Sequence, residues 1–189
     1  MNMSEMSIHS IAGFCNERAL WKLLVDLSSK LLNEPSNARK VVTPEIVIID
    51  GENFRLNDEN SQNQSTEFYP PEGIENSGRE GLVWSLAALV CYASSGHYVF
   101  GGRGGSYQHC HPKVELPTLK KEHYSLAALV KRGLCYTPSQ RISLDELHAM
   151  AVRGLESNAE MSRVKRLNES SEATSSIDTM DDIWPDKMG

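Results

Sequence analysis

The sequence lacks the features of a membrane protein, of a nucleic-acid binder and of a disulfide-stabilised protein. Its most apolar run, residues 82–93, is too short to cross a bilayer. The 19 basic residues are outnumbered by 25 acidic ones, and a net charge of −6 argues against binding nucleic acid through phosphate contacts. The four cysteines are dispersed without a C-x-x-C pair, and the first residues do not resemble a secretion signal. We therefore expect reduced thiols, a cytoplasmic location and no membrane partner.

What the sequence does contain is mostly helical patterning. Apolar residues recur at helical spacing over residues 16–34, which end before a proline. Residues 82–93 are apolar on every side, which predicts a helix buried all round at the centre of the domain. An amphipathic helix is predicted at about residues 125–134, and Ser143 with Glu146 forms a capping box that opens a last helix. The fold class is therefore mainly α.

Strand patterning is confined to one place. Residues 41–49 are apolar and β-branched, and Asp50-Gly51 separates them from a second short run at residues 54–56. This arrangement predicts a short two-stranded β-hairpin. Residues 96–117, rich in Gly, His and Pro, are read as a long loop or a short helix.

Composition divides the chain into three parts. We expect a flexible N-terminus over residues 1–15, a helical domain over 16–156, and an acidic tail over 157–189 that is partly helical and then disordered. The end of the tail contains Trp184 among aspartates. This end is interpreted either as a docking peptide or as a solvated extension.

Four motifs then follow one another along the helical domain: TPEIVI at residues 43–48, YPPE at 69–72, VWSLAAL at 83–89 and TPSQRIS at 137–143. In this order and spacing they resemble the C-terminal lobe (C-lobe) of a eukaryotic-type protein kinase that lacks its N-terminal lobe (N-lobe). The first resembles the segment after the catalytic loop, and the second the end of the activation segment. The third is similar to the start of the central helix, and the fourth to a late signature of the lobe. The resemblance implies a kinase C-lobe-like helical domain.

The same resemblance implies an ion pair between Glu72 and Arg141. In kinases the matching carboxylate and guanidinium tie the end of the activation segment to the late helices. The planar fork of arginine suits this role because it can bind a carboxylate through two parallel hydrogen bonds. The alternative is that the two residues are separate surface charges.

The residues that would carry phosphoryl transfer are degenerate. Alignment on the PE dipeptide puts Val41 where a kinase has its catalytic aspartate, Thr43 where it has the loop lysine, and Ile46 where it has the metal-binding asparagine. Only Asp58 matches, at the place of the other metal-binding residue. The residues before Ala19 include no lysine and leave no room for an N-lobe. We therefore expect a pseudokinase with no catalytic residue, metal or cofactor.

Two further groups of residues could form sites. Arg103 lies in a GGRGG run at residues 101–105, which could form an anion-binding nest but is read as a flexible loop. His109, Cys110 and His111, with a more distant cysteine or histidine, could ligate zinc, although their spacing matches no standard structural site. A Cys/His nucleophile pair has no orienting third group.

The preferred function is that of a catalytically inactive, kinase-C-lobe-like module for protein interaction or regulation, with Arg103 and Trp184 as candidate partner contacts. The alternative is half of a protein kinase, which takes its N-lobe from another chain or only binds nucleotide. A third hypothesis is an unrelated helical enzyme that uses the loop at residues 101–111. The sequence identifies neither the partner nor the oligomeric state.

Overall fold

The computed structural model describes residues 6–35, 41–57, 65–120 and 123–175. The chain divides into two units, residues 1–155 and 156–189. The helices longer than one turn are α1 (Glu17–Asn33), α2 (Arg79–Ser95), α3 (Gly104–Cys110), α4 (Tyr124–Gly133) and α5 (Leu144–Ser175), and the strands are β1 (Met6–Ser7), β2 (Val47–Asp50) and β3 (Asn53–Leu56).

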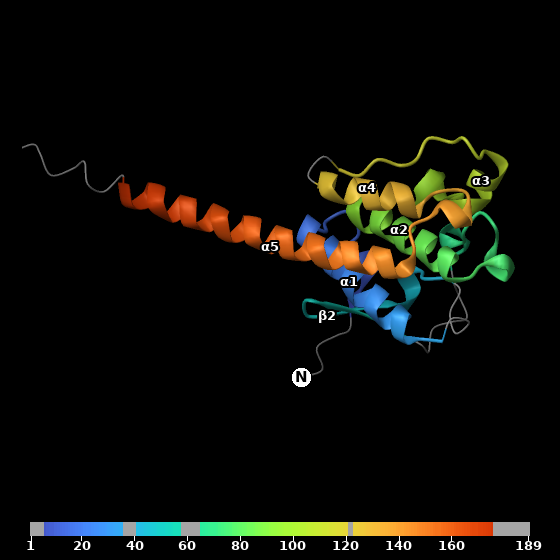
Figure 1. The fold of residues 1–189 in the computed structure, drawn as a ribbon, viewed down its shortest axis with the longest axis horizontal. Coiled ribbons are helices and arrows are strands. Elements are labelled where there is room, and N and C mark those ends of the chain that lie inside the picture. The colour runs from blue at the N-terminus through green and yellow to red at the C-terminus, as the bar shows by residue number, and fades with distance from the viewer. Residues whose placement is uncertain (1–5, 36–40, 58–64, 121–122, 176–189) are drawn as a thin grey trace, which may run out of the picture. The chain divides into compact units, whose positions relative to one another are not determined.

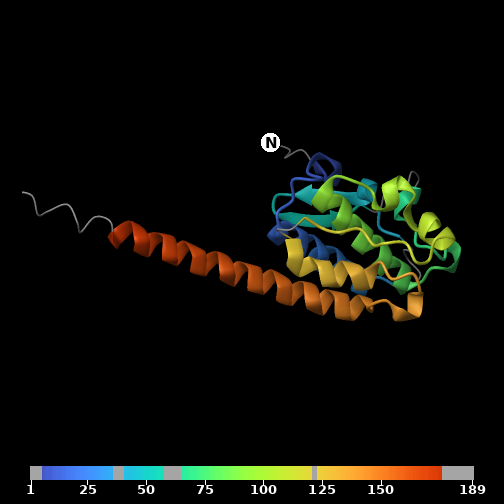
Figure 2. The ribbon, with the colours of Figure 1, turned by 90° about the horizontal axis from the view of Figure 1, so that it is seen from above.

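Helix α2 lies at the centre of the first unit, as the apolar run at residues 82–93 predicts. It contacts α1 and α4 (Figures 1 and 2). Its residues from Gly81 to Ser94 are all buried, and Trp84 is fully buried. A helix without a polar face can only be stable when packed on all sides, so the other elements are arranged around α2.

Two glycines allow helices to approach closely. A Cβ atom on Gly133 of α4 would lie 2.6 Å from the Cβ of Ala87 on α2, and one on Gly154 of α5 would lie 2.5 Å from the ring of Trp21 on α1. Neither position has room for a side chain, so glycine sets the distance between these helices. The first part of α5 also buries Leu147 and Ala151 in the core.

The sheet differs from the predicted two-stranded hairpin because it has a third strand. Strands β2 and β3 pair antiparallel with Ile49 opposite Phe54, and β1 adds to the free edge of β2 with Met6 opposite Ile49. The sheet packs on α1. There, Asp26 Oδ2 accepts a hydrogen bond of 2.9 Å from the backbone N–H of Phe54. Helix α1 thus holds the hairpin in place.

Residues 6–15, part of the N-terminus that the sequence predicts to be flexible, contact the core in the structure. Ile8 is fully buried in the core, and the backbone N–H of Gly13 donates to the carbonyl of Ala93 on α2 at 2.9 Å. Two contacts hold residues 6–15 in place: the burial of Ile8 and the pairing of β1 with the edge of β2. Neither contact produces a periodic pattern in the sequence.

Helix α5 continues through the boundary of the two units as far as Ser175, so the described part of the tail is helical. Met161 and Val164 are exposed in the second unit. The predicted disorder at the end of the tail concerns residues 176–189, which lie outside the described residues. Among the described residues, no helix is long and apolar enough to cross a membrane.

Candidate functional site

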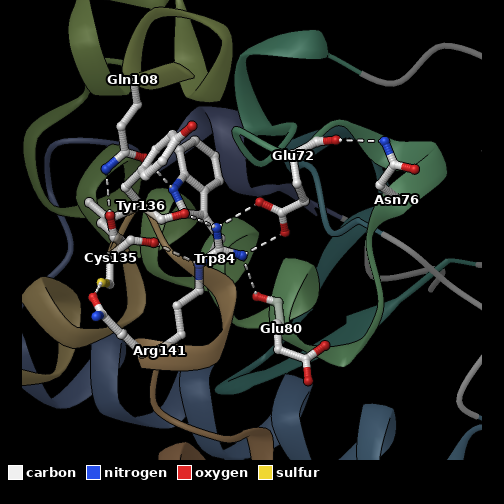
Figure 3. A network of polar contacts seen from close by, with 10 residues as sticks. Glu72, Asn76, Glu80, Trp84, Gln108, Cys135, Tyr136 and Arg141 are labelled. Carbon is white, nitrogen blue, oxygen red and sulfur yellow. Dashed lines mark hydrogen bonds and ion pairs between the residues drawn. The ribbon is translucent and has the colours of Figure 1, made fainter. Parts of the chain in front are cut away.

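The structure brings Glu72 and Arg141 together. The two terminal nitrogens of the Arg141 guanidinium, Nη1 and Nη2, donate to Oε1 and Oε2 of Glu72, each at 2.7 Å (Figure 3). The side chain of Arg141 is 0% exposed and that of Glu72 is 15% exposed. We call this buried two-point ion pair the latch. It joins the segment before α2 to the segment before α5.

The remaining donors of Arg141 bind backbone carbonyls. Nε donates to Cys135 at 2.7 Å, Nη1 also donates to Glu80 at 3.1 Å, and Nη2 also donates to Tyr136 at 3.0 Å. Together with the two bonds to Glu72, these contacts satisfy every N–H of the guanidinium. A buried charge is tolerated only when it is paired and hydrogen-bonded in this way, so the latch is a structural element.

A second buried hydrogen-bond chain lies beside the latch. The indole N–H of Trp84 donates to Oε1 of Gln108 at 2.9 Å, and Nε2 of Gln108 donates to the carbonyl of Leu134 at 2.7 Å (Figure 3). Gln108 is 2% exposed. This chain links α2, α3 and the end of α4. Sequence reasoning missed Gln108, because a glutamine in a loop-like stretch carries no signal of burial.

The segment at residues 41–46, where the resemblance would place a catalytic loop, is buried and largely apolar. Val41, Thr43 and Ile46 are each at most 1% exposed, so their side chains belong to the core. Neither Val41 nor Ile46 can form a hydrogen bond or bind a metal through its side chain. Asp58, the remaining candidate, lies outside the described residues.

Ser85 of α2 braces this segment. Its Oγ accepts a hydrogen bond of 3.0 Å from the backbone N–H of Val42 and donates one of 3.0 Å to the carbonyl of Leu82. Sequence reasoning did not single out Ser85. A signal was present, because a lone serine in an apolar helix must find a polar partner when it is buried.

Polar atoms in the same segment are less well satisfied than those of the latch. Thr43 Oγ1 and Glu45 Oε2 are buried without a hydrogen bond of ordinary geometry. Glu45 Oε1 accepts a hydrogen bond from the hydroxyl of Ser65 and lies 3.6 Å from Nε2 of His9. His9 Nδ1 in turn lies 2.8 Å from the hydroxyl of Tyr92.

Two pKa shifts mark this cluster. Burial acts to raise the pKa of the Glu45 carboxyl, but hydrogen bonding by Ser65, the nearby hydroxyl of Thr43 and backbone N–H groups outweighs burial and lowers it below 4.5. Burial raises the pKa of the Tyr92 hydroxyl, helped by Tyr98 and by the charge of Glu45. The lowered pKa keeps Glu45 as a carboxylate at neutral pH and makes it a weak base.

The glycine-rich run around Arg103 has a packing role. A Cβ atom on Gly104 would lie 2.3 Å from the carbonyl oxygen of Glu67, and one on Gly105 would lie 2.4 Å from the backbone of Pro70 and Pro71. These glycines therefore allow α3 to pack against the segment that leads to the latch. Arg103 itself is exposed and lies over the ring of Tyr107, 3.8 Å from the centroid.

The residues weighed as possible zinc ligands, His109, Cys110 and His111, are not part of a metal-binding group in the part of the chain that the structure describes. No group of three or more His, Cys, Asp or Glu side chains there could hold a metal ion. His123 is buried, with Nδ1 2.7 Å from the hydroxyl of Ser94. Burial raises the pKa of the Cys15 thiol to about 11 and that of Cys91 to about 12, which makes both poor nucleophiles.

Trp184, the second candidate partner contact, lies outside the described residues. Comparison with protein-family models and with curated proteins finds no match to this chain.

Proposed function

We propose that this chain is a catalytically inactive, kinase-C-lobe-like module that acts in protein interaction or regulation. The observation that carries the proposal is the contrast between the latch, whose donors are all paired, and the segment at residues 41–46. In that segment Val41 and Ile46 are buried aliphatic side chains at the positions where the resemblance implies a base and a metal ligand.

Physical chemistry supports the absence of phosphoryl transfer. That reaction depends on positioned groups that neutralise phosphate charge and accept a proton. An aliphatic side chain at the base position removes general-base catalysis, which is worth about 10²–10⁴-fold in rate. The Arg141 network, by contrast, serves architecture and leaves no N–H free to bind a phosphate.

A thermal-shift titration with ATP and Mg²⁺ tests this proposal against the nucleotide-binding alternative. A ligand at one hundred times its Kd stabilises the native state by about 2.7 kcal/mol, which raises the melting temperature of a chain of this size by about 5–10 °C. We expect no shift. A magnesium-dependent rise of that size would overturn the non-catalytic role, and ATP without Mg²⁺ is the matched control.

Affinity capture tests the interaction role directly. We expect the full chain to retain a specific protein partner after a high-salt wash, because interfaces with a buried apolar centre resist screening. Capture by a chain that ends at residue 156 shows whether the acidic tail contributes. We also propose the cytoplasm as the compartment, since all four cysteines are free thiols and Cys110 is exposed.

A further inference from the structure

Positive charge is concentrated in one stretch of an otherwise acidic chain. Residues 97–140 contain six basic and two acidic residues, whereas the whole chain has a net charge of −6. This stretch runs from the end of α2 to the latch and includes α3 and α4. A local excess of positive charge in a chain that is negative as a whole favours a surface that attracts an acidic partner.

Two hollows adjoin each other on this stretch, beside the turn that follows α3. One has a volume of about 510 Å³ and the other of about 390 Å³. Both are lined by Pro112, Lys113 and Val114. Tyr107 completes the first, and Leu134 contributes to the second. Apolar side chains thus form most of the floor, which suits the side chain of a bound peptide.

The cations at these hollows have no acidic partner among the residues that the structure describes. Lys113 and Lys131 line the second hollow and are exposed, and Arg103 lies on the ring of Tyr107 beside the first. None of the three forms an ion pair with a described carboxylate. By contrast, Arg132, the neighbour of Lys131 on α4, forms an ion pair with Glu146. Its Nη2 donates to Glu146 Oε1 at 2.7 Å. The unpaired cations therefore remain available to an incoming carboxylate.

We propose that these two hollows, which we call the Lys113 groove, bind an acidic peptide segment of a partner protein that carries an aliphatic or aromatic anchor residue. The anchor fills a hollow, and flanking carboxylates pair with Lys113 and Lys131. The stacking of Arg103 on Tyr107 restrains that side chain before binding, which lowers the entropic cost of contact. This inference rests on the proposed interaction function and assigns it a surface and a partner chemistry.

Fluorescence anisotropy with the full chain tests the groove. The probe is a fluorescein-labelled octapeptide in which Leu-Trp is flanked on each side by three aspartates. One control peptide has asparagine at all six flanking positions, and another keeps the aspartates but has Gly-Gly at the centre. We expect each control peptide to bind at least about tenfold more weakly than the probe, because both charge and anchor contribute.

Charge reversal locates the binding surface. We expect K113E/K131E to weaken probe binding by about tenfold or more, since two attractions become repulsions. The matched control, Arg153→Glu, reverses an exposed cation on α5 outside the groove and should change the Kd less than twofold. A melting temperature equal to that of the unmodified chain shows that each variant is folded.

Three results would overturn the proposal. The first is equal binding by K113E/K131E and R153E. The second is equal binding of the probe and its Gly-Gly form, which would indicate simple charge attraction. The third is full displacement of the probe by a thymidine oligonucleotide at the same charge concentration. None of these results restores catalysis, whereas a magnesium-dependent ATP shift would overturn the proposed function whatever the peptide does.

Discussion

Two segments that pack against α2 differ in how completely their buried polar atoms are hydrogen-bonded. Around Arg141, a buried charge has an acceptor for every donor. In the segment at residues 41–46, most side chains are apolar, and Thr43 Oγ1 is buried without a hydrogen bond of ordinary geometry to a described residue. The comparison indicates that hydrogen bonding of buried polar atoms is more complete where Arg141 joins two segments than in the segment at residues 41–46.

The largest expected effect comes from breaking the latch. Arg141→Met leaves the Glu72 carboxylate, 15% exposed, without its partner, and we expect a loss of about 3–5 kcal/mol in the free energy of unfolding. The matched control is Arg132→Met. Its pair with Glu146 has the same length of 2.7 Å, but both side chains are 47% exposed, so its removal should cost about 0–1 kcal/mol. Urea unfolding measures both, and equal losses would show that the latch is no different from a surface pair.

An intermediate effect is expected from Gln108→Met beside the latch, and Thr43→Val in the segment at residues 41–46 is its comparison. Gln108→Met leaves the indole N–H of Trp84 and the carbonyl of Leu134 without partners. We expect it to cost about 1–3 kcal/mol.

Thr43→Val removes a hydroxyl that has no hydrogen bond of ordinary geometry. We expect this change to lie within about 1 kcal/mol of neutral, because the hydroxyl is only one of several groups that stabilise the Glu45 carboxylate. Thermal unfolding of the two variants measures both changes in stability. If Thr43→Val proves as costly as Gln108→Met, the two segments do not differ in the way we describe.

The smallest expected effect is the pH dependence due to Glu45. Because its folded pKa lies below 4.5, its carboxylate stabilises the folded chain at pH values above 4.5, and this contribution is lost as pH falls through the folded pKa. The stability difference between the unmodified chain and Glu45→Gln should therefore shrink below about pH 4.5. Urea midpoints at several pH values test this. A difference that grows with acidification would mean that the pKa shift has the opposite sign.

The fold was predictable where the signal is local. The uniform apolarity of residues 82–93 predicts α2, and the Asp50-Gly51 turn predicts the pairing of β2 with β3. Strand β1 was not predictable, because two residues cannot show alternation and their order depends on Ile8 reaching the core. The sequence alone also could not show that glycines 104 and 105 serve close packing, since the backbone they meet is more than 30 residues away.

The candidate site shows the same division. Glu72 and Arg141 lie 69 residues apart, so no spacing rule could join them, and only the resemblance to a kinase lobe implied the pair. Gln108 and Ser85 acquire their roles from segments that fold against them. The Lys113 groove arises from two segments separated in sequence, so it becomes visible only when α4 and residues 111–116 are placed together.

The burial of α2 on every side has a consequence for how this protein can change over time. Along the fourteen positions from Gly81 to Ser94 there is no solvent-facing site at which a substitution is neutral by default. Loops and the charged surface of α5 can diverge freely, while this helix tolerates little beyond exchanges of similar volume. A distant relative of this chain would therefore be identified by the sequence of α2 before that of any surface segment.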